Sequence, residues 1–357
     1  MSTLSKNKVV LGLSGGVDST TAALLLKEKG FSVIGFYFDV LGNNEKGRKA
    51  AENLAKQLEI PFFSMDVSGE FDETIIGNFC SEYSLGRTPN PCVLCNPTIK
   101  FKKLLQIADE NGAYYIATGH YARVFHEEST DIYYIRKGAN QRKDQSYMLY
   151  RLGRNVLSRL ILPLGEIADK ERTRALARQH EMPNADTVDS QEICFIDDKK
   201  EDYAAFLSRR GVLFEEGDFV DAEGSVLGRH QGVGRYTIGQ RKGLGIALGK
   251  PAFVTAIDAE NNRVVLGDNQ ALFTREVKSS NNFFTATDSD VLPEDLMGKS
   301  GLSAKIRYKA EFSPVSLSKI NDNRILAVFE EPQRAAAPGQ SMVFYDGELV
   351  VGGGFID

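Results

Sequence analysis

The sequence predicts an α/β doubly wound parallel sheet at the N-terminal end, followed by two small β-barrel-like domains. Over about the first 120 residues, short runs rich in Val, Ile and Phe alternate with helix-forming runs. Such alternation builds right-handed βαβ units around a parallel sheet. Beyond about residue 205, turn signals such as Asp258–Asn262 and Tyr345-Asp-Gly347 separate short alternating apolar segments. That texture is typical of small barrels or sandwiches.

The predicted elements of the first domain follow one another in a regular order. Lys8–Leu13 is a short apolar run bounded by glycine, which predicts a buried strand. Helix formers from Thr20 to Lys29 end at Gly30, a residue type common just after a helix. We further expect strands at Ser32–Phe38, Phe62–Val67 and Tyr114–Thr118, and helices at Lys46–Leu58 and Phe101–Glu110. Ligands of such sheets bind beyond the carboxyl ends of the strands.

We expect three domains. The first covers residues 1–205, with a segment at about 161–182 that can pack with the next domain. The second covers 206–268 and the third 269–357, where Arg263–Leu266 and Ile325–Phe329 are examples of the alternating apolar segments.

Composition narrows the class of protein. The 357 residues include 43 Lys plus Arg and 48 Asp plus Glu, so the net charge is −5, which argues mildly against a nucleic-acid partner. No apolar run approaches the ~18–20 residues that span a bilayer, and the first residues lack the apolar stretch of a signal peptide. Four cysteines in so long a chain cannot form a disulfide scaffold. We therefore expect a cytoplasmic protein without a membrane partner, in which cysteines are reactive, metal-binding or buried.

The segment Ser14-Gly-Gly-Val-Asp-Ser19 predicts a phosphate-binding loop. It lies between the first strand and the first helix, where glycines permit a tight turn and the helix N-terminus attracts anions. Ser14 and Ser19 add hydroxyl donors. Asp18 would repel phosphate unless it binds a bridging Mg²⁺. The segment is not a Walker A loop, because no Gly-Lys-Ser/Thr follows. A tight turn without a ligand is the weaker alternative.

Three of the four cysteines lie in unusual surroundings. Cys92 and Cys95 lie in the proline-rich stretch Thr88–Asn96, and Cys194 lies in Ser190–Ile196. A single Cys-x-x-Cys fits half a zinc site, a redox pair or part of an iron–sulfur ligand set. No second such pair exists, which disfavours a structural zinc site. Cys80 is predicted to be a core residue.

Basic residues cluster despite the acidic total. Arg136–Arg154 holds six basic residues against the single acid Asp144, and Gly224–Lys250 holds five basic residues and no acid. Such runs, interleaved with glycine in the second case, predict contacts with RNA phosphates, to which we assign Arg241 and Lys242. A solvated basic face is the alternative.

The loop at 14–19 resembles the signature of the ATP pyrophosphatase (PP-loop) family. This resemblance implies an adenine nucleotide α-hydrolase-like fold and cleavage of ATP between the α and β phosphates. The residues that it implies for ATP binding are Gly12, Leu13, Ser14, Gly15, Gly16, Val17, Asp18, Ser19, Phe38 and Gly119.

Six motifs in one order resemble the tRNA-specific 2-thiouridylase (MnmA) family over nearly the whole chain. They are the Thr88–Asn96 loop, Gly119-His-Tyr121, Lys143–Tyr147, Ser190–Ile196, Thr237–Gly243 and Pro338-Gly-Gln340. The resemblance implies ATP- and Mg²⁺-dependent 2-thiolation of the wobble uridine (position 34) of tRNAs for Lys, Glu and Gln, with release of AMP and pyrophosphate. It also implies a cysteine desulfurase or a persulfide relay protein as sulfur donor.

The resemblance also implies residue roles. Cys194 would carry a persulfide and Cys95 would attack it, closing a Cys95–Cys194 disulfide that a reductant resets. Asn90, Pro91 and Cys92 would contact the target base. The residues implied for tRNA contact are His120, Lys143, Asp144, Gln145, Ser146, Arg307, Tyr308 and Gln340. For His120, a purely structural role is the alternative. Catalytic thiols should have lowered pKa values and partial exposure.

The chain departs from the family pattern at Cys92, where many members have Asp. The loss puts an acid/base role at this position in doubt, and it leaves Cys92, Cys95 and Cys194 as conceivable ligands of a [4Fe–4S] cluster, the alternative to the persulfide route. More distant alternatives are another PP-loop adenylating ligase and an inactive RNA-binding or sulfur-carrier protein.

Overall fold

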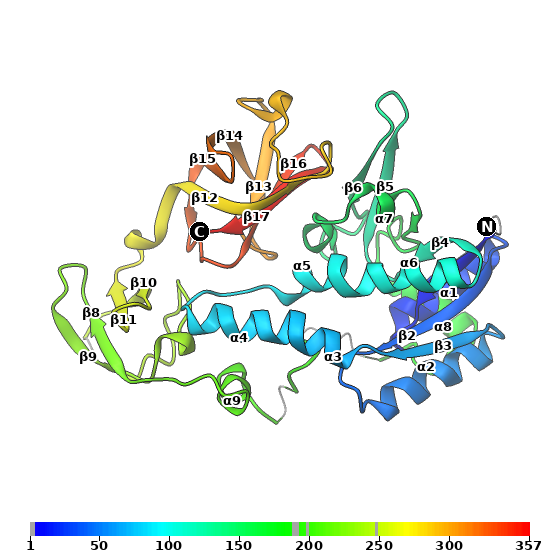
Figure 1. Cartoon of the computed structure of the whole chain (residues 1–357), viewed down its shortest axis with the longest axis horizontal. Coiled ribbons are helices and arrows are strands. Elements are labelled where there is room, and N and C mark those ends of the chain that lie inside the picture. Colours follow the sequence, from blue (N-terminus) through cyan, green and yellow to red (C-terminus); the bar gives the residue numbers. More distant parts are fainter. Residues whose placement is uncertain (1–3, 188–192, 198–199, 247–248) are drawn as a thin grey trace. The chain divides into compact units, whose positions relative to one another are not determined.

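The computed structural model describes residues 4–187, 193–197, 200–246 and 249–357. The chain divides into two compact units (Figure 1). The first unit comprises Met1–Thr74, Cys92–Gln191 and Glu348–Val351, and the second comprises Ile75–Pro91, Glu192–Gly347 and Gly352–Asp357. Each unit has its own sheets and core, and each is described by itself.

The first unit contains a five-stranded parallel sheet in the order β3-β2-β1-β4-β7. Its strands are β1 (Ser5–Gly12), β2 (Ser32–Asp39), β3 (Phe62–Asp66), β4 (Ala113–Ala117) and β7 (Leu160–Ile161). The four strands expected from the sequence are confirmed to within a few residues. The short β7 was not expected, because two residues carry no periodic signal.

Helices cover this sheet as expected for a doubly wound fold. The longer ones are α1 (Val17–Glu28), α2 (Glu45–Gln57), α6 (Phe101–Glu110) and α8 (Lys170–Gln179). Val9 and Leu11 are fully buried in a cluster that includes α1 and α8 side chains. Val10 is equally buried and points the other way, since strand residues alternate, and α6 packs against β1 and β4. Within the segment 161–182, α8 packs against α1.

Smaller elements complete the first unit. They are the short helices α3 (Ser68–Phe71), α5 (Pro91–Cys95), η2 (Asn96–Lys100), η3 (Ser146–Leu149) and α7 (Arg154–Leu157), and the strands β5 (Ala122–Glu127) and β6 (Ile132–Lys137). β5 and β6 form a hairpin, and β6 also pairs with Leu349 and Val350.

The second unit begins with helices and a four-stranded sheet. The helices are η1 (Asp72–Ile76), whose first residues belong to the first unit, α4 (Gly77–Ser84) and α9 (Tyr203–Arg209), and the sheet has the order β10-β11-β8-β9. Its strands are β8 (Gly217–Val220), β9 (Val226–His230), β10 (Phe253–Asp258) and β11 (Arg263–Gly267), with η4 (Val233–Arg235) after β9. Phe219, Val254 and Val264 form the centre of its core.

A closed antiparallel barrel follows. Its strands are β12 (Phe273–Phe284), β13 (Leu302–Lys305), β14 (Ser313–Asn321), β15 (Arg324–Arg334), β16 (Ser341–Asp346) and β17 (Leu349–Ile356), and the short helices η5 (Gln270–Leu272) and η6 (Glu294–Leu296) lie in its connections. The order β12-β15-β14-β13-β16-β17 closes because β12 also pairs with β17. Closure removes the open sheet edges, so the predicted C-terminal barrel is confirmed.

Candidate active site

The loop between β1 and α1 is built as an anion site. Gly15 has a φ of +87°, which residues with a Cβ avoid. The Ser19 hydroxyl donates to the Gly16 carbonyl at 3.0 Å and accepts the Ser14 backbone N–H at 3.2 Å. α1 then begins at Val17, and the first N–H groups of a helix have no partner within it. The loop therefore offers backbone donors at the positive end of a helix.

Three strand ends meet around this loop. Gly119 follows β4, and a Cβ there would lie 2.9 Å from the backbone carbon of Asp18, so only glycine fits. At the end of β1, a Cβ on Gly12 would lie 3.5 Å from the ring of Phe38 in β2. β1 lies between β2 and β4, where the strand order reverses, and ligands bind at such a switch point. The residues expected around ATP are thus brought together. Leu13 and Val17 are buried.

Asp18 is held by two residues that no motif had marked as its partners. Its Oδ1 accepts the Tyr121 hydroxyl at 2.8 Å and the Lys170 Nζ at 2.5 Å. The Lys170 side chain is only 14% exposed, and Nζ lies 5.5 Å from the centroid of the Tyr121 ring. The position of Tyr121 directly after His120 could have pointed to it, whereas Lys170 carries no motif. The predicted Mg²⁺ ligand is therefore paired with a cation in this structure.

The segment 143–146 supports Tyr121 from behind. Gln145 Oε1 accepts the Tyr121 N–H, and the Gln145 N–H donates to the Tyr121 carbonyl, both at 2.9 Å. Asp144 is 9% exposed, and its carboxylate accepts the N–H and the hydroxyl of Ser146, which is fully buried. The side chains of Asp144 and Ser146, both expected to contact tRNA, thus hydrogen-bond each other inside the loop. Lys143 and Gln145 are half-buried.

Cys92 and Cys95 lie one turn apart on α5. Pro91 takes the first position of this helix, where its missing N–H costs nothing. After Cys95 the helix widens into the π-helical turn η2, a feature frequent at functional sites. Cys92 is exposed and Cys95 is half-buried, so the two thiols meet different surroundings.

The expectation of a lowered pKa is wrong for Cys95. Burial raises the pKa of its thiol above the usual range, and the nearby Cys92 adds to this rise. The Lys100 ammonium and backbone N–H act in the opposite direction but do not offset the loss of water. Cys95 is therefore a thiol rather than a thiolate at neutral pH.

This raised pKa predicts how fast Cys95 reacts with iodoacetamide. The rate depends on the thiolate fraction, which grows about tenfold per pH unit below the pKa. We expect the alkylation rate of Cys95, followed by peptide mass spectrometry, to rise with that slope from pH 7 to 8.5. A plateau below pH 8 would show a lowered pKa instead. The alkylation rate of exposed Cys194 in the same samples is the internal reference for the reactivity of the reagent and for unfolding of the chain.

His120 is a neutral residue in this site. Its Nδ1 lies 2.6 Å from the Thr118 hydroxyl oxygen, and its ring stacks on Phe101 with centroids 6.0 Å apart. Burial and the Lys100 ammonium hold the pKa of His120 well below its usual range. An uncharged ring can hydrogen-bond an RNA group or hold Thr118, but it cannot serve as a cation for phosphate.

In the second unit, a buried aromatic anchor presents Cys194. The neighbouring Phe195 is 7% exposed and packs edge-on against Phe79 of α4, with centroids 5.2 Å apart, and against Phe206 of α9 at 5.4 Å. Cys194 itself is exposed. Residues 190–192 of the predicted motif lie outside the described residues. Cys80, predicted to be core, is only half-buried on α4.

Three motifs that are far apart in the sequence converge on Thr88. Its N–H donates to the Pro338 carbonyl, and its carbonyl accepts the Gln340 Nε2, both at 2.7 Å. Its hydroxyl lies 3.4 Å from that of Thr237. Gln340, expected to contact tRNA, thus braces the loop that leads to the predicted target-base residues. Asn90 and Pro91 follow in this loop and are half-buried.

Comparison with known proteins identifies the family. The chain matches the family models described as tRNA methyl transferase HUP domain over residues 7–198, tRNA methyl transferase PRC-barrel domain over 204–268 and aminomethyltransferase beta-barrel domain over 281–356. It is 45% identical to tRNA-specific 2-thiouridylase MnmA 1 of Caldanaerobacter subterraneus subsp. tengcongensis, covering 98% of both chains. It is 41% identical to tRNA-specific 2-thiouridylase MnmA of Acetivibrio thermocellus, covering 99% of this chain and all of the relative. The chain belongs to the tRNA-specific 2-thiouridylase family.

A solved structure shows a more distant likeness. The U34-tRNA thiolase NcsA from Methanococcus maripaludis with its [4Fe-4S] cluster is 21% identical, with a TM-score of 0.35 over 58% of this chain and 66% of that chain. A likeness of this size says nothing about the mechanism of the present 2-thiouridylase family member.

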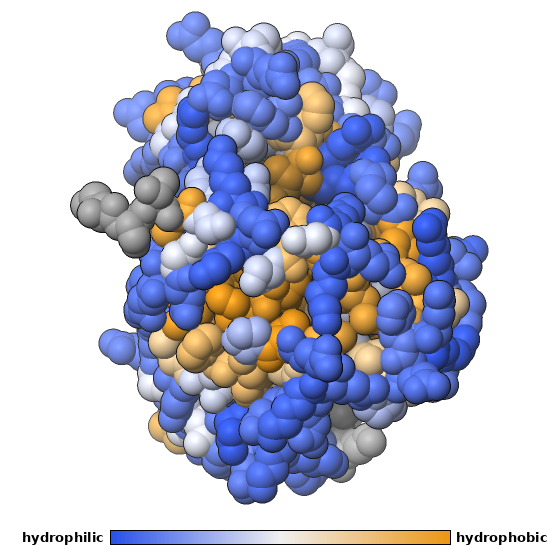
Figure 2. Space-filling model, turned by 90° about the vertical axis from the view of Figure 1, so that its right-hand side faces the viewer, coloured by the Kyte–Doolittle hydropathy of each residue, from blue (hydrophilic) through white to orange (hydrophobic). Residues whose placement is uncertain are grey.

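Ion pairs neutralise part of the positive charge of the first basic run, residues 136–154, in this family member. Arg136 pairs with Glu348 and Arg154 pairs with Asp131, so two of its six cations are neutralised. Figure 2 shows a largely hydrophilic face with hydrophobic residues gathered near its middle. Hydropathy does not distinguish basic from acidic groups, so this view does not locate the basic runs.

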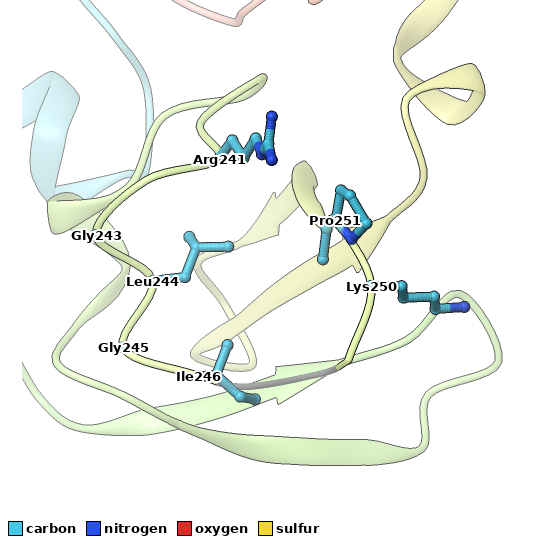
Figure 3. Close-up of a pocket in the computed structure, with 8 residues that line it drawn as sticks. Arg241, Gly243, Leu244, Gly245, Ile246, Lys250 and Pro251 are labelled. Atoms are coloured by element: carbon cyan, nitrogen blue, oxygen red, sulfur yellow. The ribbon is translucent and has the colours of Figure 1, made fainter.

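The second basic run surrounds a pocket (Figure 3). Arg229 pairs with Asp218 at 2.7 Å, which removes one cation. Arg241 and Lys250 line a pocket of about 580 Å³ together with Leu244 and other residues of the glycine-rich stretch. Arg241, Lys242 and Lys250 are exposed, and no ion pair joins them to another described residue. Phosphate binding fits this group best.

Arg307 and Tyr308, expected to contact tRNA, lie after β13 and are half-buried. Arg307 Nη1 donates to the Arg334 carbonyl at 2.9 Å. The Lys305 ammonium lies 5.8 Å from the centroid of the Tyr308 ring. This corner of the barrel therefore combines a cation with an aromatic ring, which suits RNA.

Replacement of Lys242 by Ala is expected to weaken tRNA binding by about 3- to 10-fold at low salt. Each phosphate contact that is lost should lower the slope of log affinity against log salt by about 1. Filter binding over a salt series measures both. Lys29→Ala, an exposed position at the far end of α1 with the same charge change, is the control. Equal slopes for the two variants would remove Lys242 from the RNA surface.

No helix within the described residues is long and apolar enough to cross a membrane. Within the same residues, no three His, Cys, Asp or Glu side chains gather into a group that could hold a metal ion.

Proposed function

We propose that this chain catalyses ATP-dependent 2-thiolation of the wobble uridine of tRNA. The observation that carries the proposal is the 45% identity over 98% of the chain to a tRNA-specific 2-thiouridylase, together with the phosphate loop at the switch point of the sheet. The proposal includes the tRNAs for Lys, Glu and Gln as substrates, a persulfide donor such as a cysteine desulfurase or relay protein, and a cytoplasmic location.

The first step is adenylation of the target uracil. The C2 oxygen attacks the α-phosphorus of ATP, pyrophosphate leaves, and C2 gains an adenylate leaving group. The loop at 14–19 fits a polyphosphate, because its N–H groups and hydroxyls surround a turn that only glycine can form at residue 15. Asp18 fits a Mg²⁺ site, since Mg²⁺ in nucleotide sites often takes one carboxylate plus phosphate oxygens. Mg²⁺ would neutralise the pyrophosphate that leaves.

The base would be held by Asn90, Pro91 and Cys92. Pro91 begins α5 and so fixes the direction in which Cys92 and Cys95 leave the loop. Thr88, braced by Gln340 and Thr237 as described above, holds the loop from the other side. An unstacked base is commonly held by contacts of this kind to its edges.

The sulfur step uses two cysteines. The terminal sulfur of a Cys194 persulfide attacks C2 and displaces AMP. Cys95, after giving its proton to a base or to water, then attacks Cys194 Sγ, which breaks the S–S bond, leaves sulfur on C2 and forms a Cys95–Cys194 disulfide. An external dithiol reduces this disulfide and completes the cycle. Cys95 and Cys194 belong to different units, so the step requires the units to bring the two thiols to one base.

The alternative is a [4Fe–4S] cluster on Cys92, Cys95 and Cys194. It would need the two units to bring Cys194 to Cys92 and Cys95, which lie one turn apart in the first unit, just as the persulfide route needs them to bring Cys194 to Cys95. We derive no step through a cluster.

Anaerobic reconstitution tests the proposal. Purified protein receives ATP, Mg²⁺, unmodified tRNA and either a persulfide donor or sulfide, and 2-thiouridine is measured by mass spectrometry after nuclease digestion. We expect 2-thiouridine at position 34 with about one AMP and one pyrophosphate per product, from a preparation free of iron and of ~400 nm absorbance. Activity only in iron-loaded protein would favour the cluster route. Pyrophosphate release without 2-thiouridine from any sulfur source would point to another adenylating ligase.

A further inference from the structure

A half-buried lysine from a helix distant in the sequence reaches the phosphate loop. Lys170 is the first residue of α8, and its N-cap Asp169 accepts the Glu171 N–H. Its Nζ lies 2.5 Å from Asp18 Oδ1 and 5.5 Å from the centroid of the Tyr121 ring. No motif contains Lys170, and the ATP site described above does not require it. A lysine that is 14% exposed has given up most of its hydration, which is costly unless an anion compensates.

The region after Lys170 is fastened to the same loop at further points. The Thr173 hydroxyl lies 2.9 Å from the Tyr121 hydroxyl, and the Thr173 carbonyl accepts the Thr21 hydroxyl at 3.1 Å. Asn184 Nδ2 donates to the Gly15 carbonyl at 2.8 Å and to Thr20 Oγ1 at 2.9 Å. The position of Lys170 is therefore fixed by contacts on both sides of the loop rather than by one flexible side chain.

A second observation at this corner is a buried hydrogen-bond acceptor without a donor among the described residues. Asn184 is 8% exposed, and its Oδ1 is buried without a hydrogen-bond partner among the described residues. Buried acceptors without a donor are rare, because each costs about 1–3 kcal/mol. The Nδ2 of the same amide is fixed on Gly15 and Thr20, so the amide cannot turn to relieve its oxygen. A hydroxyl or a water carried by a bound nucleotide would satisfy it.

The charge arrangement explains why a lysine is needed here. Asp18 lies in the first turn of α1, where the helix end favours a negative charge. The same carboxylate would repel an incoming polyphosphate. Pairing with Lys170 removes this repulsion while leaving the helix N–H groups available. Asp18 would hold a Mg²⁺ ion, which would neutralise phosphate oxygens, and the Lys170 ammonium, 2.5 Å from Asp18 Oδ1, would lie beside the same phosphates.

We propose that Lys170 is a phosphate-binding residue of the ATP site. When ATP binds, the Lys170 ammonium changes its ion-pair partner from Asp18 to the β- and γ-phosphates. The inference rests on the proposed ATP-dependent function. It assigns to α8 a direct part in holding the pyrophosphate that leaves. AMP lacks these two phosphates and so should not depend on Lys170.

Equilibrium nucleotide binding tests this inference separately from thiolation. The anisotropy of a fluorescent N-methylanthraniloyl nucleotide is convenient, because the chain has no Trp that would add fluorescence. We expect Lys170→Gln to weaken ATP binding about 10- to 100-fold, as for the loss of a charge-assisted contact. The affinity of inorganic pyrophosphate, measured by competition, should fall by a similar factor. AMP competition should change less than 3-fold. Arg172→Gln, an exposed residue in the same turn, is the matched control.

A double variant separates direct contact from an effect through Asp18. If Lys170 binds phosphate, Lys170→Gln still weakens ATP binding at least 5-fold in an Asp18→Asn background. Disappearance of the effect there, equal losses for ATP and AMP, or wild-type ATP affinity of Lys170→Gln would each overturn the inference. Failure of the wild-type chain to bind ATP would instead overturn the proposed function. If Lys170→Gln does not fold, Lys170→Met, which keeps an unbranched side chain of similar length, replaces it.

Discussion

Replacement of Cys194 by Ser abolishes 2-thiouridine formation, by at least about 1000-fold, and leaves tRNA-dependent pyrophosphate release within about 3-fold of wild type. A serine hydroxyl cannot carry a persulfide, so sulfur cannot reach C2, whereas adenylation uses the phosphate loop of the other unit. Cys194 is exposed next to buried Phe195, and the substitution removes no core contact. Quantitative mass spectrometry of the nucleosides and a coupled pyrophosphate assay on the same samples measure both effects.

Two further serine variants make this test specific. Cys80→Ser, a half-buried thiol in the same unit, should retain full thiolation and so controls for general loss of a thiol. Cys92→Ser separates the two sulfur routes: the persulfide route predicts a modest reduction, and a cluster ligand predicts complete loss. Normal 2-thiouridine yield from Cys194→Ser would refute its role as sulfur carrier.

The elements of the first unit were predictable because their signals are local. A run such as Lys8–Leu13 is apolar, short and ended by glycine, and the observed β1 and α1 differ from prediction by only a few residues. It was also predictable that the ligand site lies beyond the carboxyl ends of the strands, since ligands of doubly wound sheets bind there. The strand order itself was not, because nothing in the sequence of β4 shows that it pairs beside β1.

The partners of the functional side chains were much less predictable. Lys170 and Asp18 are 152 positions apart, and neither the spacing nor the residue type indicates that they meet. Asp144 and Ser146 stand as polar residues in a basic run, and nothing in the sequence shows that their side chains hydrogen-bond each other. The pKa of Cys95 depends on how much water its surroundings exclude, and single-sequence patterns do not report burial of an isolated residue.

Replacement of Asp18 by Asn is expected to slow pyrophosphate release by about 100- to 1000-fold, equivalent to about 3–4 kcal/mol of transition-state stabilisation. The amide keeps an oxygen for the Tyr121 hydroxyl, which donates to Asp18 at 2.8 Å, so the loop geometry is preserved. What is lost is the negative charge that would hold Mg²⁺ against the leaving pyrophosphate. Single-turnover release measured with saturating ATP and tRNA isolates this step from ATP affinity.

The same substitution should also destabilise the folded chain. The Lys170 ammonium, 14% exposed, loses its carboxylate partner, and we expect the free energy of unfolding to fall by about 1–3 kcal/mol at pH 7. Asp109→Asn is the control, because Asp109 also pairs with a cation, Arg159, at 2.7 Å, but lies near the end of α6, just before the amino end of β4 and away from the strand ends that carry the phosphate loop. The Asp109→Asn variant should unfold at a slightly lower urea concentration than the wild type and release pyrophosphate at the wild-type rate. If Asp18→Asn also released pyrophosphate at the wild-type rate, its only role would be to pair with Lys170, and the Mg²⁺ site would have to be sought elsewhere.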